Sequence, residues 1–303
     1  GIGGIAQHVK GLKNFLENED NEVEVISSEN TFTIPIKKLK NPSFMISSFL
    51  KTKFKKNFDI VHVQNPISAL AMTNVSGKKI LSLQGDYSKQ ISLLHGNTMG
   101  KLSAKLEKNA FEWADVITVP SKQMYEEFLK KGYNVFYVPN AIDISSFSHD
   151  EDRRYEKQII YAGRLSEEKG ILDLLEISGK IPKDIDLIIV GSGPEESKVK
   201  ETVKKFSNIH FLGYQSKENT IKLIRGSDIL IQPSLMEGGT SSTLLEAMVC
   251  KTPIIATSVD GNKETIIQMK TAYVVRPRCP IEILDALLDL FDSTEKRKNL
   301  SET

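Results

Sequence analysis

Two glutamates stand at either end of a loop of small residues in the segment PSLMEGGTSSTLLEAM, residues 233–248. The apolar residues 229–231 predict a buried strand before this segment, and the spacing in LLEAMVC predicts a helix after it. The small residues therefore lie at a helix N-terminus, where free N–H groups and the helix dipole favour an anion such as phosphate. Because a carboxylate repels phosphate, Glu237 and Glu246 are better suited to accept hydrogen bonds from hydroxyls. Phosphate together with hydroxyls suggests a nucleotide sugar.

A second segment places two cations on one loop. YAGRLSEEKG follows a predicted strand and enters a helix, and it carries Arg164 and Lys169. These side chains are suited to hold a diphosphate, Arg164 through its planar guanidinium and Lys169 as a point charge. The alternative is a solvated loop, in which Arg and Lys are common. In VGSGPE, Gly191 and Gly193 either let the backbone approach a ligand or simply make a tight turn.

The elements that must position these residues alternate between short β-rich runs and amphipathic helical stretches. This order predicts two successive α/β domains with parallel sheets, residues 1–150 and 151–303, joined by a polar linker. Ligands of such sheets bind outside the carboxyl ends of the strands, and we expect the site in a cleft between the domains. The predicted strands are 22–27, 59–63, 79–83, 115–119 and 134–138, followed by 158–163, 186–191, 209–213, 228–232, 253–257 and 272–275.

The composition of the 303 residues, 40% apolar and 26% charged, is that of a soluble globular protein. A net charge of +1 excludes a strong general attraction to nucleic acid. The two cysteines make no disulfide framework, and no signal peptide or membrane span is evident, so we expect a cytoplasmic protein. The chain opens on a glycine-rich turn and stops within a charged helical pattern, and we interpret it as a fragment lacking its first strand and its last helices.

Seven motifs in order resemble the retaining glycosyltransferases of family 4. They are GGIAQHVKGL, DIVHVQNP, ADVITVPSKQMYEEF, VPNAID, YAGRLSEEKG, VGSGPE and the block PSLMEGGTSSTLLEAM with the strand and turn that follow it. The resemblance covers nearly the whole chain and implies the GT-B fold, two Rossmann-like parallel-sheet domains facing across a cleft. It also implies sugar transfer from a nucleoside diphosphate sugar, with no cofactor, and the lack of a D-x-D motif agrees with independence from metal.

The resemblance assigns roles to individual residues. Arg164 and Lys169 would neutralise the leaving diphosphate, and Glu237 would contact the sugar hydroxyls near the reacting carbon, which makes these three the predicted catalytic residues. Glu246 would bind the ribose hydroxyls of the donor. The other predicted donor-binding residues are Gly3, Gly4, Gln84, Gly191, Gly193, Gly239, Thr240, Ser241 and Ser242 and, where the family holds the nucleobase, Tyr214 and Gln215.

The donor block departs from the family pattern in its length. Eight residues separate Glu237 from Glu246, whereas the family pattern has seven. We expect the extra residue to bulge in the loop. Glu246 is then secured by its helix, and the sugar contact of Glu237 is the sharper test of activity.

A second departure lies in SLQGDYSKQ, where Gln84 stands at a position that many members fill with a histidine near the transferred sugar. Glutamine does not exchange a proton near neutral pH, so a general-base role is excluded here, although its amide still hydrogen-bonds a hydroxyl. Asp86 and His95 are candidates to compensate. His62, in DIVHV, is predicted to be a buried structural residue.

Residues 36–58 contain seven lysines and no acid, interleaved with large apolar residues. Such a segment predicts either a basic amphipathic helix on an anionic membrane or a packed surface helix with solvated lysines. The first alternative implies peripheral contact with the inner membrane face and a lipid-linked or membrane-proximal acceptor. Glycans and small molecules are the other acceptor classes.

Two other functions stay open. A nucleotide-sugar 2-epimerase has the same fold and donors but needs an acid and a base flanking the sugar. A non-catalytic nucleotide-sugar-binding module agrees with Gln84 and the longer loop. In every case the expected partner is a nucleotide sugar, with an unidentified acceptor for transfer and no nucleic acid.

Overall fold

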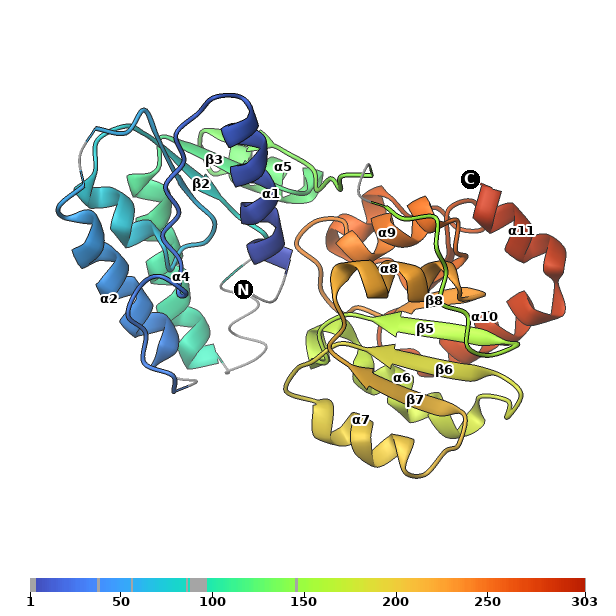
Figure 1. Ribbon diagram of the computed structural model, residues 1–303. Helices are drawn as coiled ribbons and strands as arrows, with labels where there is room; N and C mark the ends of the chain where they lie inside the picture. The colour runs from blue at the N-terminus through green and yellow to red at the C-terminus, as the bar shows by residue number, and fades with distance from the viewer. Residues whose placement is uncertain are drawn as a thin grey trace. The chain divides into compact units, whose positions relative to one another are not determined.

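The computed structural model describes residues 4–36, 39–55, 57–85, 87, 97–144 and 147–302. The chain forms two compact units, Gly1–Pro139 and Asn140–Thr303 (Figure 1). Each unit is built on a parallel sheet with helices packed on it, and the predicted α/β architecture is confirmed.

The first unit has a sheet with the strand order β1-β2-β3-β4, in which every pair is parallel. Its core is apolar, with Leu81 and Ile117 of the sheet buried against Phe111 and Phe128 of the helices. The strands are β1 (Ile60–Val63), β2 (Lys78–Ser82), β3 (Val116–Val119) and β4 (Val135–Tyr137). The helices are α1 (Gly4–Asn18), α2 (Lys40–Thr52), the 3-10 helix η1 (Ala69–Asn74), α4 (Asn97–Trp113) and α5 (Lys122–Lys130).

The strand predicted at residues 22–27 is not formed. Residues 21–27 have no regular secondary structure. The alternation of glutamate and valine satisfies the side-chain pattern of a strand, but a strand also needs a hydrogen-bonded neighbour. No described strand of this unit pairs with the segment. Local contacts hold it instead: Asn30 Nδ2 donates to Val25 O at 2.7 Å, and Lys55 pairs with Glu24 at 2.6 Å.

The second unit has a six-stranded parallel sheet in the order β10-β9-β8-β5-β6-β7. All the strands predicted after residue 150 are present. They are β5 (Gln158–Ala162), β6 (Asp186–Val190), β7 (Ile209–Gly213), β8 (Ile229–Gln232), β9 (Ile254–Thr257) and β10 (Tyr273–Val275). The α-helices are α6 (Ile171–Ile177), α7 (Glu196–Val203), α8 (Lys217–Arg225), α9 (Ser242–Cys250), α10 (Pro280–Asp292) and α11 (Thr294–Glu302), and the 3-10 helices are η2 (Glu167–Lys169), η3 (Ser178–Lys180) and η4 (Asp260–Glu264).

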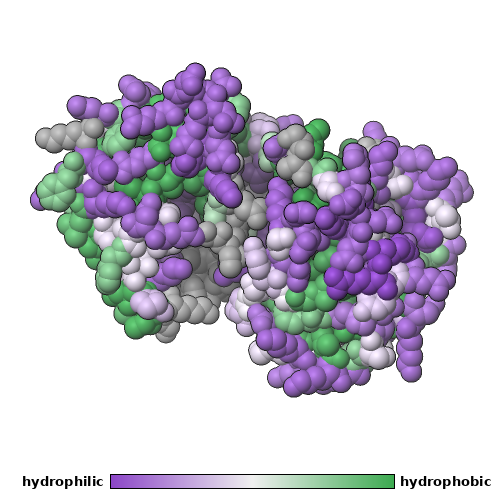
Figure 2. All heavy atoms as spheres, in the orientation of Figure 1, coloured by the Kyte–Doolittle hydropathy of each residue, from purple (hydrophilic) through white to green (hydrophobic). Residues whose placement is uncertain are grey.

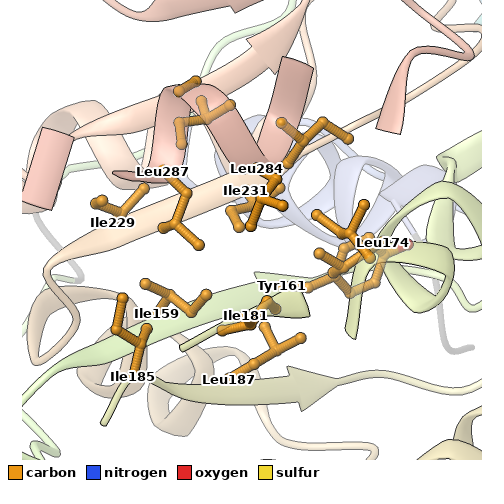
Figure 3. Close-up of a cluster of buried hydrophobic side chains, with 14 of the residues drawn as sticks. Ile159, Tyr161, Leu174, Ile181, Ile185, Leu187, Ile229, Ile231, Leu284 and Leu287 are labelled. Atoms are coloured by element: carbon orange, nitrogen blue, oxygen red, sulfur yellow. The ribbon is translucent and has the colours of Figure 1, made fainter. Parts of the chain in front are cut away.

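Both faces of this second sheet are covered. Ile159 and Tyr161 of β5 face α6, α7 and α10, and the cluster they join is drawn in Figure 3. Ile160 and Ala162 of the same strand face α8 and α9 on the other side. A strand that is buried on both faces is rich in apolar residues, which explains the apolar run from Ile159 to Ala162 in β5.

In the part of the chain that the structure describes, no helix combines the length and the apolar character needed to cross a membrane.

Candidate functional site

The order of the strands in the second sheet predicts where a ligand would bind. From β5 the chain moves outward through β6 and β7, and it then returns to the other side of β5 to add β8, β9 and β10 (Figure 1). The strand order therefore reverses between β5 and β8. In open parallel sheets ligands bind outside the carboxyl ends of the two strands at such a switch point. The loop after β5 carries Arg164 and Lys169, and the loop after β8 carries Glu237.

Lys169 and Glu237, which are 68 positions apart in the sequence, form an ion pair. Lys169 Nζ lies 2.6 Å from Glu237 Oε2, and the exposed fractions of the two side chains are 27% and 7%. The other carboxylate oxygen, Oε1, accepts hydrogen bonds from Ser234 Oγ at 2.8 Å and Gln232 Nε2 at 3.3 Å. Both carboxylate oxygens of Glu237 thus have protein partners, and the side chain of Lys169 remains partly exposed to solvent.

The two loops are joined through their backbones as well. The carbonyl oxygen of Glu168 accepts hydrogen bonds from the amides of Leu235 at 2.9 Å and Met236 at 3.2 Å. Gly170 has a φ of +69°, and a Cβ atom there would lie 1.8 Å from the carbonyl oxygen of Pro233. Only glycine allows this approach, so the backbone sets the distance between Lys169 and the loop that carries Glu237.

Arg164 presents its guanidinium to solvent, with 57% of the side chain exposed. Its NH1 lies 3.6 Å from Oε1 of Glu168, whose side chain is only 3% exposed. The other oxygen of Glu168 has no hydrogen-bond partner among the described residues. On the backbone side, the buried hydroxyl of Tyr161 donates to Arg164 O at 2.8 Å. Burial raises the pKa of Tyr161, so this hydroxyl stays protonated and remains a donor.

Gly191 and Gly193 follow β6 and lie against the loop that carries Arg164. A Cβ atom on Gly191 would be 1.8 Å from Gly163 O, and one on Gly193 would be 2.3 Å from Leu165 O. The structure therefore gives both glycines a packing role between neighbouring loops. Their predicted contact with the donor stays a prediction.

The residues Gly239, Thr240, Ser241 and Ser242 lie where predicted, at the N-terminus of α9, with Ser241 as the N-cap. The amide of Ser241 donates to Asn262 Oδ1 at 3.0 Å, so it is engaged within the protein. The first amides of a helix have no acceptor inside the helix, which leaves those of Ser242 and the next residue to face an anion.

Glu246 lies on α9 and is buried, with 7% exposure. The nearest cation is Lys217, whose Nζ is 4.0 Å from Oε1. Burial raises the pKa of Glu246 to about 7, and Lys217 offsets only part of that effect. Placed so, the carboxylate can accept hydrogen bonds from a diol that enters the site, as the ribose role requires.

The raised pKa of Glu246 predicts a pH-dependent stability. Because the folded state holds this proton more tightly than the unfolded chain, the extra stability is complete below pH 4.5 and is lost as the pH rises to about 7. In urea unfolding across this range, the wild type should lose about 3 kcal/mol more than Glu246→Gln. An equal pH dependence in both proteins would contradict the assignment.

Tyr214 and Gln215 follow β7, as the sequence predicted. The ring of Tyr214 is 52% exposed and available to stack on a flat ligand group. Gln215 donates from Nε2 to Leu212 O at 2.9 Å, which fixes its side chain beside the turn. The structure brings both to the carboxyl edge of the sheet, and their contact with a nucleobase stays a prediction.

In the first unit a chain of polar contacts leads to Gln84. Gln84 Nε2 donates to Gln64 Oε1 at 3.4 Å, and Gln64 Nε2 lies 3.1 Å from His62 Nε2. His62 Nε2 is also 2.6 Å from Ser82 Oγ. The prediction that His62 is buried is wrong: the residue is exposed, although partial desolvation of its ring and the nearby His8 lower its pKa. Its neutral ring then accepts from Gln64.

The structure describes only some of the residues predicted in the first unit. Gly4 is the first residue of α1. Gly3, Asp86 and His95 lie outside the described residues.

Several residues of the site were not found by sequence reasoning. Gln232 and Ser234 hold the carboxylate of Glu237, and Asp260 and Asn262 hold the backbone around it. Gln232 and Ser234 flank Pro233, the first residue of the quoted motif, and their short sequence distance from Glu237 was a signal. Asp260 and Asn262 follow the next strand, and only the adjacency of β8 and β9 brings them here.

Among the described residues, no group of three or more His, Cys, Asp or Glu side chains is arranged to hold a metal ion. Independence from metal stays a prediction.

Two family models match the chain. The one described as glycosyl transferases group 1 matches residues 142–303, and the one described as glycosyltransferase family 4 matches residues 2–146. Together they cover both units of the structure.

Two curated relatives and one solved structure show the same likeness. An uncharacterised glycosyltransferase of Methanocaldococcus jannaschii is 27% identical over 266 residues, which cover 82% of this chain but only 63% of that protein. N-acetyl-alpha-D-glucosaminyl L-malate synthase of Bacillus anthracis is 25% identical over 280 residues, 85% of this chain and 72% of that protein. The Anabaena protein HepE, solved in complex with UDP-glucose, has a TM-score of 0.70 at 16% identity, covering 96% of this chain and 82% of its own, and shares the fold.

Proposed function

The chain belongs to the glycosyl transferases group 1 family, and we propose that it moves a sugar from a nucleoside diphosphate sugar to an acceptor hydroxyl with retention of the anomeric configuration. The observation that carries this proposal is the Lys169–Glu237 pair of 2.6 Å at the strand switch point, on the loop that also carries the exposed guanidinium of Arg164. The UDP-glucose bound to HepE, a protein of the same fold, supports a donor of this class.

Each charged group has a distinct task in the proposed reaction. As the bond between the sugar and the diphosphate breaks, negative charge grows on the departing phosphate oxygen. Arg164 and Lys169 stabilise that charge, and preorganised groups of this kind supply the largest catalytic contribution in many enzymes. Glu237, held by its protein partners, accepts hydrogen bonds from sugar hydroxyls and so orients the anomeric carbon.

The donor's nucleoside occupies the other end of the same edge. Glu246 accepts hydrogen bonds from the ribose diol, and the exposed ring of Tyr214 stacks on the base. The first amides of α9 face the diphosphate between these two ends.

A panel of labelled nucleoside diphosphate sugars, offered with glycan, lipid-linked and small-molecule acceptors, tests the proposal. Release of nucleoside diphosphate that depends on an acceptor, with the label appearing in the acceptor, is the expected result. Interconversion of the donor sugar without transfer would indicate an epimerase instead. Binding without turnover of any donor would indicate a non-catalytic module.

We further propose that the first unit contacts an anionic membrane through α2. The buried face of this helix carries Ser48 and Thr52, whereas Ile46 and Leu50 are 55% and 54% exposed, and Phe54 just beyond the helix is 86% exposed. Figure 2 shows hydrophobic atoms along this side of the unit, bordered by hydrophilic ones. Apolar side chains facing outward among lysines suit the surface of an anionic bilayer. The predicted lysines Lys37, Lys38 and Lys56 lie outside the described residues.

Flotation with anionic liposomes tests this contact. Replacing Leu50 and Phe54 together by glutamate should reduce the bound fraction at least tenfold, because inserting each apolar side chain contributes about 1.5–3 kcal/mol. Leu129→Glu on α5 is the matched control, since Leu129 is 52% exposed on the same unit. Equal flotation of the double variant and the control would refute the contact.

A further inference from the structure

The loop that follows Glu237 is hydrogen-bonded to the turn that follows β9. Thr240 Oγ1 lies 3.2 Å from Gly261 O and 2.6 Å from Thr265 Oγ1. A Cβ atom on Gly261 would lie 2.3 Å from the Cα atom of Gly239, so the two backbones are in direct contact. The turn therefore forms one wall of the loop that carries the extra residue.

Asp260 makes the contact nearest to Glu237. Its Oδ2 accepts the backbone N–H of Glu237 at 2.8 Å. Asn262, two positions later, accepts the N–H of Ser241 at 3.0 Å and is fully buried. One turn thus holds the backbone on both sides of the longer segment.

The backbone of Asp260 is in an unfavourable conformation. Its φ is +39°, in the left-handed region that glycine adopts far more easily than other residues. Such a conformation costs free energy and persists only when other contacts maintain it. The carboxylate of Asp260 supplies one such contact by accepting from the Glu237 amide. A glycine at this position would relieve the strain but could not accept from Glu237.

We propose that Asp260 is a positioning residue that keeps Glu237 in register with Lys169 across a loop with eight residues between its two glutamates. The amide of Glu237 is fixed by Asp260, and the carboxylate is fixed by Ser234 and Lys169. With the backbone anchored, the extra residue bulges beyond Glu237 rather than displacing it. The effect of Asp260 on turnover rests on the proposed function, whereas its effect on the Lys169–Glu237 pair does not.

Three variants separate positioning from folding. Asp260→Gly and Asp260→Ala lose the acceptor, whereas Asp260→Asn keeps it, because the amide oxygen can take the same N–H. Asp260→Gly also removes the strained φ, so its melting temperature should not fall. We expect Gly and Ala to lower kcat at least tenfold with the donor Kd changed less than threefold, and Asn to retain wild-type turnover.

A second measurement does not depend on turnover. The rate at which acetic anhydride labels Lys169, followed by mass spectrometry, reports whether its ammonium group is still paired with Glu237. We expect labelling to rise at least threefold in Asp260→Gly and Asp260→Ala, but not in Asp260→Asn, with Lys180 as the internal reference. If labelling rises in this pattern but no variant or wild type transfers sugar, the proposed function fails and the positioning role stands. If Asp260→Gly labels and turns over like the wild type, the positioning role is overturned.

Discussion

Replacing Lys169 by methionine should lower kcat about 100-fold, the effect of removing one preorganised group that stabilises developing negative charge. The Lys169 side chain is 27% exposed, so its ammonium group is accessible to a ligand while it stays paired with Glu237 at 2.6 Å. Methionine keeps most of the length and apolar character of lysine and removes only the charge. Steady-state kinetics with the donor identified in the panel measure the change.

The same substitution also affects the fold, and a second variant separates the two effects. Glu237 is the buried partner of the pair, and removing Lys169 leaves its charge unpaired, which costs up to about 3–5 kcal/mol. The double variant Lys169→Met with Glu237→Gln lacks that charge and should recover stability in urea unfolding, yet it should remain slow. Recovery of turnover together with stability would show that Lys169 is structural only. Lys180→Met, on the exposed end of η3, is the matched control.

The second unit could be predicted closely from the sequence because its central strands, β5, β8 and β9, are buried on both faces. In β5, all five residues from Gln158 to Ala162 are buried, and an unbroken apolar run between polar turns is typical of a strand that helices cover on both sides. Residues 22–27 show the limit of such patterns. Alternating valines predict which side chains would share a face, but whether a strand forms depends on a partner distant in the sequence.

The same distinction applies to the site. Arg164, Lys169 and Glu237 were predicted because each stands in a local motif with recognisable chemistry. The partners that hold them were not predicted, because Lys169 meets Glu237 and Asp260 meets the Glu237 amide only after β5, β8 and β9 lie side by side. His62 was misjudged for a related reason: its strand pattern indicated burial, whereas the exposure of β1 depends on what packs over it.

Gly170→Ala should disrupt both the fold and the site, although it adds a single methyl group. The new Cβ atom would lie 1.8 Å from Pro233 O, so the loop after β5 must move away from the loop after β8. The backbone of residue 170 also has a φ of +69°, a conformation that costs alanine about 1 kcal/mol. Strain and overpacking together should lower the free energy of unfolding by about 3 kcal/mol. Because Lys169 is the preceding residue, its pairing with Glu237 is lost and kcat falls at least tenfold.

Gly213→Ala isolates the part of this effect that comes from packing. Gly213 has nearly the same φ, +67°, but no atom lies within 4 Å of the position its Cβ would take. It therefore carries the conformational cost alone, and urea unfolding should show a loss of about 1 kcal/mol. The difference between the two variants measures how tightly the backbone of the Lys169 loop is packed against that of the Glu237 loop. If Gly170→Ala were no less stable than Gly213→Ala, the close approach of the two loops would not be what sets the geometry of the ion pair.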